Sequence, residues 1–332
     1  MSIILSPWEQ LDWLEQAHDW ILSELARKGI KVSGEIEQAH IRPWSTVMRV
    51  ATKDGFYFFK ATAPYFGYET TLTEYLARTQ PLLVPQLLAH DLNRHWLLMR
   101  DSGIPLRTFI RAEKSIDPWR KVLPLYVELQ KHLAGQVTDL LGLGVMDRRL
   151  KYLSGQFVEL LKDESALLLD QPSGLTSAEF SRIRSLIPQF QQICAHLADF
   201  GIPESLHHDD FHDGNIFLHD NQVIFTDWGE CAIAHPFFTL VVMLRSVENS
   251  LDLPPNASEI QTMRDWYLAL WEDYAPILKL RELAELAECI GYVNRALTWH
   301  MVISTLPESL KPEYALAVPA YLKDYLNAVD RK

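Results

Sequence analysis

Apolar residues near the start of the chain recur with the spacing of one helical face. Ser6-Pro7-Trp8-Glu9 offers a capping hydroxyl, a proline at the first helical position and a glutamate three residues after the cap. Gly29 is a residue type at which helices commonly end. The pattern therefore predicts a leading helix over residues 7–28. Its apolar positions are Trp8, Leu11, Leu14, Ile21, Leu22 and Leu25.

A second pattern, of short runs rich in β-branched and aromatic residues, occupies the chain from Gly34 to about Thr62. Two of these runs flank Lys53-Asp54-Gly55, and an Asp-Gly pair in that position is a strong hairpin signal. A helix and a further buried strand follow, which gives a small mixed lobe over residues 1–100. The predicted elements are strands at 47–52 and 56–61, a helix at 67–78 and a strand at 96–99.

Beyond Ser102 the hydrophobic positions are spaced mostly as in helices. The exception is Leu206–Asp227, where short apolar runs alternate with turn residues. We expect a functional site at such a strand-rich segment inside a helical region. The sequence thus predicts a second, helical lobe over residues 101–332. Its predicted helices span 118–133, 149–162, 177–199, 260–272, 280–303 and 312–329.

Length and charge narrow the class of protein. A chain of 332 residues is too long for one ordinary core, which agrees with two lobes. The net charge of -12 argues against a nucleic-acid partner, because phosphate backbones bind clustered Lys and Arg. The most apolar run, 231–244, is interrupted by His235 and Pro236 and falls short of a membrane span, so no membrane partner is expected.

The cysteines and the first residues bear on location. Cys194, Cys231 and Cys289 lie far apart, which fits neither a disulfide framework nor a metal-ligand spacing. We expect them to be buried as small hydrophobic residues. The first eight residues have no basic region before an apolar stretch, so a signal peptide is not predicted. The reducing cytoplasm is the predicted location.

The segment from Leu206 to Glu230 holds most of the candidate chemistry. Phosphoryl transfer requires a carboxylate that accepts the proton of the attacking hydroxyl, oxygen ligands for Mg²⁺ and a cation on the phosphates. Asp210 and Asn215 are five residues apart, which lets a compact loop present a base and a metal ligand together. Asp227 ends an apolar run and can add an oxygen ligand, because Mg²⁺ prefers few protein oxygens together with phosphate oxygens.

Lys60 is the candidate cation. It ends the second strand of the predicted hairpin, and Glu69 lies on the helix that follows. A strand lysine paired with a helical glutamate holds its ammonium group over the α- and β-phosphates of a nucleotide. Taken alone, Lys60 is also compatible with an ordinary residue at a strand end, and Glu74 on the same helix is a rival partner.

These motifs resemble those of the aminoglycoside phosphotransferase and choline kinase family, whose members are relatives of protein kinases. The family signature reads His-Gly-Asp-x-x-x-x-Asn, followed by an apolar strand that ends in Asp-Phe or Asp-Trp. His208–Asn215 matches its first part with Asp209 in the glycine position, and Thr226-Asp227-Trp228 matches its second part. The spacing in the family favours Glu69 as the partner of Lys60.

The resemblance implies an α+β, two-lobed, protein-kinase-like fold and an enzyme that moves the γ-phosphate of ATP to a small hydroxylated molecule. It implies that Asp210 is the catalytic base and that Asn215 and Asp227 bind Mg²⁺. Backbone groups near Met99 and Asp101 are implied to receive the adenine. The resemblance covers about residues 41–244, and the terminal helices match only in character.

Two departures of the sequence from the family matter most. No glycine lies between Gly34 and Gly55, where the family often has glycine in its nucleotide loop. We expect Ser45 and Thr46 to contact the phosphates instead. The second departure, Asp209, puts an extra carboxylate beside the proposed base, and the sequence assigns it no role.

Three other functions compete with this interpretation. The His and Asp residues of 207–213 are compatible with a transition-metal site, although Phe211 and the Gly-Asn turn favour a loop. A protein kinase is disfavoured, because the nine residues between Asp227 and Phe237 are too few for a long peptide-docking segment. A silent pseudokinase that binds nucleotide as a regulatory module is the third, motivated by the missing glycine and by Asp209.

The acceptor is the least determined part of the prediction. Asp209, Asp213 and Glu230 lie next to proposed catalytic residues, and carboxylates at the mouth of a cleft concentrate cations. We therefore expect a neutral or amine-bearing hydroxyl compound, held by the C-terminal helices, rather than a peptide or an anion.

Overall fold

The computed structural model describes residues 6–331, and these residues cluster into two compact units. Unit 1 contains the chain up to Ile104 together with Ile216–Gly229. Unit 2 contains Pro105–Asn215 and the chain from Glu230 onward. A short segment late in the sequence therefore belongs to the N-terminal unit.

A five-stranded sheet is the framework of unit 1, with the strand order β1-β2-β3-β5-β4 and antiparallel neighbours throughout. The predicted hairpin is confirmed: Thr52 pairs with Gly55 across the turn residues Lys53 and Asp54. Gly55 has a φ of 115°, a conformation that a side chain rarely tolerates. The strands are β1 (Val32–Arg42), β2 (Ser45–Thr52), β3 (Gly55–Thr62), β4 (Leu87–Asp91) and β5 (Trp96–Arg100).

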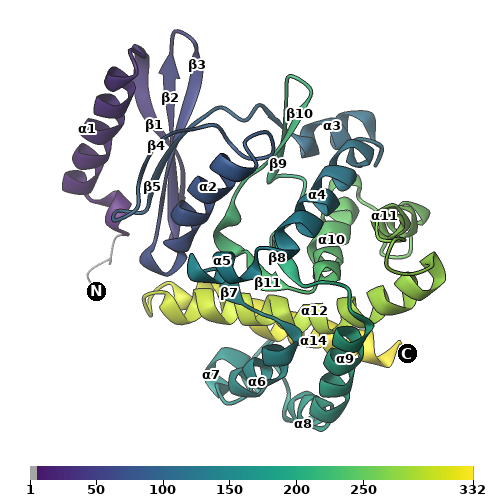
Figure 1. The fold of residues 1–332 in the computed structure, drawn as a ribbon. Coiled ribbons are helices and arrows are strands. Elements are labelled where there is room, and N and C mark those ends of the chain that lie inside the picture. The colour runs from purple at the N-terminus through teal and green to yellow at the C-terminus, as the bar shows by residue number, and fades with distance from the viewer. Residues whose placement is uncertain (1–5, 332) are drawn as a thin grey trace. The chain divides into compact units, whose positions relative to one another are not determined.

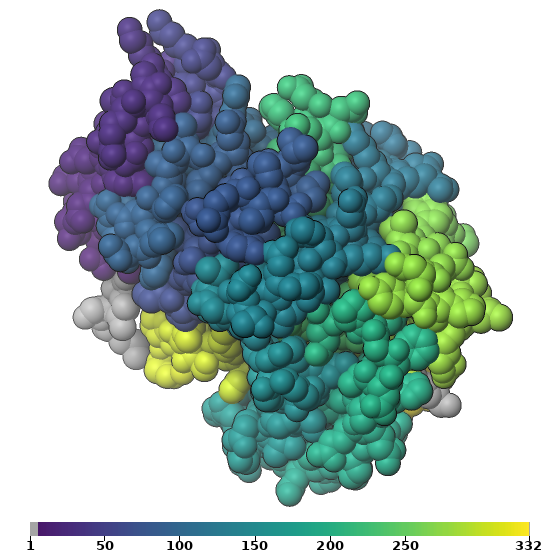
Figure 2. Space-filling view, viewed as in Figure 1, coloured from purple at the N-terminus to yellow at the C-terminus, as the bar shows by residue number. Residues whose placement is uncertain are grey.

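Helix α1 (Leu11–Arg27) covers one face of this sheet (Figure 1), and its outer side is exposed in the space-filling view (Figure 2). Its inner side packs Trp20 against Phe59 and Trp96, with ring centroids 5.8 and 5.5 Å apart. The predicted start at residue 7 is a separate 3-10 turn, Pro7–Glu9, because Gln10 is extended. This aromatic cluster is the core of unit 1.

A helix and a second hairpin of unit 1 contain or adjoin predicted site residues. Helix α2 (Tyr68–Thr79) matches the helix predicted over 67–78. Strands β9 (Ile216–His219) and β10 (Gln222–Phe225) form a hairpin with the two-residue turn Asp220-Asn221. Both turn residues have positive φ, as tight hairpin turns require.

Unit 2 is mostly helical and holds one small sheet, in which β11 (Ala232–Ala234) is parallel to β7 (Met146–Asp147) and antiparallel to β8 (Ser205–His207). Helices α12 and α14 lie side by side (Figure 1). The helices are α3 (Leu106–Glu113), α4 (Trp119–Ala134), α5 (Val137–Gly142), α6 (Leu150–Leu160), α7 (Glu164–Leu167), α8 (Ser177–Ser185), α9 (Ile187–Phe200), α10 (Thr239–Leu251), α11 (Ser258–Ala269), α12 (Ile277–Thr305), α13 (Lys311–Tyr314) and α14 (Ala317–Asp330). A two-residue strand, β6 (Ile104–Pro105), lies where the sequence passes from unit 1 to unit 2.

Some predicted helices have other limits. The helix expected over 177–199 is split at Leu186, because Pro188 lacks the amide hydrogen that a helix interior requires and instead lies in the first turn of α9. The helix expected over 312–329 is similarly divided into α13 and α14. The three cysteines are buried, as expected. Among the described residues, no helix combines the length and the apolar character that a membrane crossing would require.

Candidate functional site

The residues predicted to act on a nucleotide fall into two sets, one in each unit, and the set in unit 1 is centred on Lys60. The Nζ atom of Lys60 donates to Glu69 Oε1 at 2.5 Å and to Asp227 Oδ1 at 2.6 Å. The Lys60 side chain is 11% exposed and that of Glu69 only 3%. Burial by itself lowers the pKa of Lys60, but the two carboxylates outweigh it and hold this pKa above its usual value. Lys60 therefore carries its charge at neutral pH.

Regular elements fix the position of this ammonium group. Lys60 lies on an inner strand, where it pairs with Val47 of β2 and Leu97 of β5. Glu69 is in the first turn of α2, where the helix dipole also favours a carboxylate. A charged group held by an inner strand and a helix end is well placed to bind a ligand in one geometry.

Asp227 follows β10 in a conformation that is uncommon for its residue type. Its φ is 64°, in the left-handed region, and such residues are concentrated at functional positions. The Asp227 side chain is 53% exposed, so it can meet a ligand while it holds Lys60. Gly229 lies close to the same group, and a Cβ there would be 3.1 Å from Glu69 Oε2. A side chain at 229 would crowd the Glu69 carboxylate.

The structure corrects one expectation about the phosphate-binding stretch. Thr46 is fully buried. Its hydroxyl donates to the His40 carbonyl and accepts from Gln38 Nε2, both at 2.9 Å. The predicted phosphate contact does not hold for the Thr46 side chain, since the sheet already uses its hydrogen-bonding capacity. Ser45 is 7% exposed and begins β2 directly after the Pro43-Trp44 turn.

The residues predicted to receive adenine lie where the chain leaves the sheet. Met99 is in β5 and pairs with Phe58 of β3. The Asp101 amide donates to the Phe56 carbonyl at 3.1 Å, and Asp101 Oδ1 accepts from the Gly103 amide at 2.9 Å. These bonds hold the backbone at the end of β5, and its contact with adenine stays a prediction.

The set in unit 2 lies on the loop after β8, where Asp210 and Asn215 meet. The Nδ2 atom of Asn215 donates to the Asp210 carbonyl at 3.1 Å and to Asp210 Oδ2 at 3.2 Å. His212 Nε2 lies 3.3 Å from the same Oδ2. Because the Gly214 amide donates to His212 Nδ1 at 2.9 Å, Nε2 is the nitrogen that carries the hydrogen toward Asp210. The sequence did not predict this contact of His212.

Packing beneath the loop fixes its shape. The ring of Phe211 stacks on Tyr126 of α4, with centroids 3.8 Å apart and an interplanar angle of 18°. The buried Asp213 carboxylate accepts from Arg107 Nε at 2.7 Å and from Ser250 Oγ at 2.5 Å. Apolar and ionic contacts therefore anchor the loop on both sides of its tip.

Arg295 of α12 binds the proposed base directly. Its Nη2 atom donates to Asp210 Oδ1 at 2.9 Å, and its Nη1 atom also donates to Glu230. Burial tends to raise the pKa of Asp210, but the charges of Arg295 and of the neighbouring histidines hold it well below its usual range. Burial raises the pKa of Glu230 to about 7, although Arg295 opposes this. Asp210 is therefore ionised at neutral pH.

The carboxylates next to the loop are not arranged as the sequence suggested. Asp209 is 3% exposed and Asp213 is fully buried, and each is bound to an arginine. Glu230 is also paired with Arg295. Because these groups are paired with arginines within unit 2, and two of them are buried, they do not form the open acidic rim that was expected to favour an amine-bearing acceptor. The charges around Asp210 therefore do not favour an amine-bearing acceptor over a neutral one.

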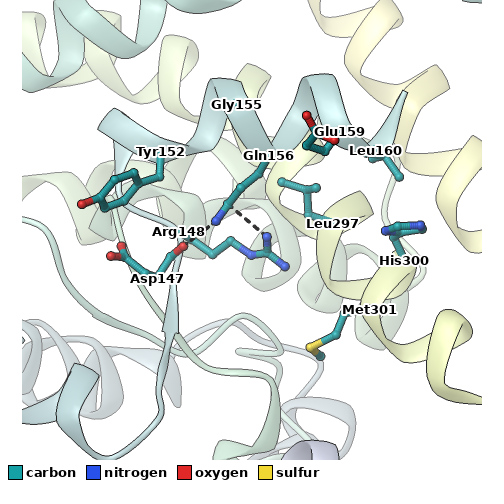
Figure 3. A pocket seen from close by; sticks show the side chains of 10 residues that line it. All are labelled: Asp147, Arg148, Tyr152, Gly155, Gln156, Glu159, Leu160, Leu297, His300 and Met301. Carbon is teal, nitrogen blue, oxygen red and sulfur yellow. Dashed lines mark hydrogen bonds between the residues drawn. The ribbon is translucent and has the colours of Figure 1, made fainter. Parts of the chain in front are cut away.

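Unit 2 also contains a pocket of about 630 Å³ between α6, β7 and α12 (Figure 3). Several of its polar side chains pair within the protein. Arg148 Nη1 donates to Gln156 Oε1 at 3.0 Å, and Gln156 Nε2 donates to the Asp147 carbonyl at 2.8 Å. His300 is hydrogen-bonded to Asp163 at 2.9 Å. The pocket shares α12 with the Asp210 cluster, but none of the predicted site residues lines it.

The donor atoms suit a magnesium ion. Asn215 and Asp227 offer amide and carboxylate oxygens, which are the ligands that Mg²⁺ takes together with phosphate oxygens. The Asn215 amide nitrogen donates to Asp210, and an amide oxygen is the atom through which asparagine binds a metal. Among residues 6–331 no group of three or more His, Cys, Asp or Glu is arranged to hold an ion, and a magnesium site at Asn215 and Asp227 stays a prediction.

Comparison with known proteins places these features in a family. The model of the phosphotransferase enzyme family matches residues 44–289, which is more than half of the chain. The matched region contains every predicted site residue, whereas Arg295 lies beyond it. No curated protein sequence matches the chain significantly.

Solved structures match over nearly the whole chain. An ethanolamine kinase from Plasmodium vivax has a TM-score of 0.62 at 12% identity, covering 96% of this chain and 91% of that one. A choline kinase from Cryptosporidium parvum has a TM-score of 0.62 at 11% identity, with coverages of 94% and 96%. A macrolide 2'-phosphotransferase from Brachybacterium faecium has a TM-score of 0.56 at 15% identity, with coverages of 90% and 98%. These likenesses confirm the predicted α+β, kinase-like fold.

Proposed function

Because the chain belongs to the phosphotransferase enzyme family, we propose that it transfers the γ-phosphate of ATP to a hydroxyl group of a small molecule. The observation that carries the proposal is the buried Lys60 Nζ atom, held between Glu69 and Asp227. Three charged groups this close, two of them on regular elements and one half-exposed, match what phosphate and metal binding require. The Asp210–Asn215 pair supplies the remaining groups.

In the proposed reaction, Lys60 binds the α- and β-phosphates and the chain near Met99 and Asp101 receives the adenine. The oxygen of the acceptor hydroxyl attacks the γ-phosphorus, and the bond from this phosphorus to the β–γ bridging oxygen breaks. ADP leaves with the electrons of that bond, and the hydroxyl proton passes to the Asp210 carboxylate. Most of the rate comes from positioning and electrostatics, because little covalent chemistry falls to the protein.

Magnesium would supply positive charge on the phosphate oxygens, and Asn215 and Asp227 would hold it. Asp210 has a different task. Since its carboxylate is ionised at neutral pH, it accepts a hydrogen bond from the acceptor hydroxyl and so aims the oxygen at the phosphorus. The two carboxylates therefore have separate roles that substitutions can distinguish.

We propose that the acceptor is a neutral or amine-bearing hydroxyl compound bound by unit 2. The short stretch between Asp227 and Phe237 offers little chain for docking a peptide. Similar folds belong to an ethanolamine kinase, a choline kinase and a macrolide phosphotransferase. The buried cysteines are compatible with a cytoplasmic location, which is part of the same proposal.

A panel of acceptors tests this function. ADP release with Mg²⁺ and ATP is measured for amino alcohols, aminoglycosides, macrolides, neutral sugars, sugar phosphates and a generic protein substrate. We expect stimulation by at least one uncharged or amine-bearing class. Stimulation confined to the protein or to sugar phosphates would contradict the proposed acceptor. Firm nucleotide binding without stimulation by any class would favour the pseudokinase.

A further inference from the structure

Arg295 makes the closest ionic contact with the proposed catalytic base. Its side chain is 5% exposed, and its two terminal nitrogens are divided between carboxylates. Nη2 donates to Asp210 Oδ1 at 2.9 Å, whereas Nη1 lies 3.3 Å from Asp209 Oδ2 and also donates to Glu230. Arginine suits this arrangement because its planar fork presents several donors in fixed directions. One oxygen of the Asp210 carboxylate is thereby held by a side chain of α12, a helix outside the loop.

Asp209 in turn holds the part of α12 that carries Arg295. Asp209 Oδ1 accepts from Asn294 Nδ2 at 2.7 Å, and Asp209 Oδ2 accepts from Thr298 Oγ1 at 2.6 Å. His207 Nε2 lies 3.0 Å from Oδ1. Glycine at position 209 would leave the amide of Asn294 and the hydroxyl of Thr298 without this acceptor.

The buried charges in this cluster restrict the positions that its side chains can take. A buried carboxylate is costly unless it is paired and hydrogen-bonded. Burial tends to raise the pKa of Asp209, but Arg295 and the bonds from His207 and Thr298 hold it well below its usual range. Asp209 and Asp210 both bind the guanidinium group, and each limits where that group can lie. Asp209, which has no role in the proposed reaction, therefore helps to fix the Arg295 guanidinium group, and that group contacts the Asp210 carboxylate.

We propose that Arg295 is a positioning residue for phosphoryl transfer, which sets the orientation of the Asp210 carboxylate, and that Asp209 acts through Arg295. The proposal rests on the proposed function. It accounts for the carboxylate in the glycine position of the family signature. The other members of the cluster, Asn294, Arg295 and Thr298, lie in α12 beyond residue 289, where the match to the family model ends.

Arg295→Lys is the central variant, because it keeps the positive charge and removes the fork. A single ammonium group cannot hold Asp209 and Asp210 in the same geometry. We expect kcat to fall about 10- to 100-fold, the loss that a small misplacement of a reacting group produces. The KM for the nucleotide should stay within about twofold, since Arg295 binds the Asp210 carboxylate and leaves the bonds of Lys60 to Glu69 and Asp227 in place. A purely structural role predicts no such separation of kcat from KM.

Arg264→Lys is the matched control. Arg264 of α11 binds Glu288 of α12 through Nη2 at 2.8 Å, so this substitution also weakens an arginine–carboxylate contact on the same helix. It does not touch Asp210. Melting temperatures of both variants are compared with wild type, and kcat of the control should remain within about twofold. Equal losses of kcat and of melting temperature in the two variants would overturn the proposal, because general weakening of α12 would then explain them.

Asp209→Asn supplies a second test that leaves Asp210 and Arg295 in place. We expect kcat to fall less than in Arg295→Lys, and the double variant to lose no more than Arg295→Lys alone, because the two residues act on one path. Additive losses, or wild-type kcat in Arg295→Lys, would contradict the inference while acceptor-dependent turnover of the wild type stood. A wild type without acceptor-dependent turnover would instead contradict the proposed function, and the inference would fall with it.

Discussion

Asp210→Asn should reduce acceptor-dependent turnover by about two to four powers of ten while nucleotide affinity changes little. The amide has nearly the size of the carboxylate and can keep a hydrogen bond to Arg295, so the loop should retain its shape. It cannot take the hydroxyl proton, and it no longer attracts the hydroxyl as an ion does. The loss should therefore appear in kcat, measured as ADP release at saturating nucleotide.

The same substitution at an exposed site controls for this result. Asp220 lies in the two-residue turn between β9 and β10, and its side chain is 92% exposed. Asparagine tolerates the positive φ of that position, so Asp220→Asn should leave turnover unchanged. Turnover near the wild-type level in Asp210→Asn would show that Asp210 is not the base.

Asp227→Ala should abolish most of the gain in nucleotide affinity that magnesium provides. The substitution removes one of the two proposed protein ligands, and loss of even an indirect partner of a metal commonly costs about 10- to 100-fold in affinity. Titration calorimetry with an ATP analogue, with and without Mg²⁺, measures the metal-dependent part. Turnover should fall with it, because the phosphates would lose charge neutralisation.

Asp227 also binds Lys60, and Glu69→Gln separates the two effects. That variant removes a carboxylate from Lys60 without removing a proposed metal ligand. We expect Glu69→Gln to weaken nucleotide binding in the presence and absence of Mg²⁺ alike, and Asp227→Ala to lose specifically the dependence on Mg²⁺. An unchanged dependence on Mg²⁺ in Asp227→Ala would mean that Asp227 is wrongly assigned.

Local sequence patterns predicted the elements that have one apolar and one polar face. The turn at Lys53-Asp54-Gly55 and the helix over 67–78 were confirmed because turn chemistry and hydrophobic spacing agree there. The run 231–244 was seen only as apolar, and the structure divides it into β11, a 3-10 turn and the start of α10. A segment buried on every side has no polar face, so periodicity does not reveal its type.

The candidate site residues could be chosen from the sequence because they follow the motifs of a known family. They are Lys60, Glu69, Asp210, Asn215 and Asp227. The supporting residues could not be chosen in this way, since their partners are brought together only by folding. Arg295 is 85 residues from Asp210. One signal was available: Asn294-Arg295 and Thr298 interrupt an apolar helix, and a buried charge there requires a partner.

The burial of Thr46 and of the carboxylates around Asp210 also depends on tertiary structure. The sequence shows that Asp209 and Asp213 are acidic and close to the proposed base. It does not show that each of them binds an arginine from a helix outside the loop. Net charge likewise does not distinguish an exposed acidic rim from carboxylates that are buried and paired with arginines. This is why the acceptor was less predictable than the reaction.

The central claim is that a phosphoryl group moves from ATP to a small hydroxyl compound. ATP labelled at the γ-phosphate is incubated with Mg²⁺ and the acceptor that most stimulates ADP release, and the products are separated and identified by mass spectrometry. The account predicts that the label appears on the acceptor, in amounts equal to the ADP formed, for the wild type but not for Asp210→Asn. Label found only in free phosphate or on the protein itself, with the acceptor unchanged, would contradict it.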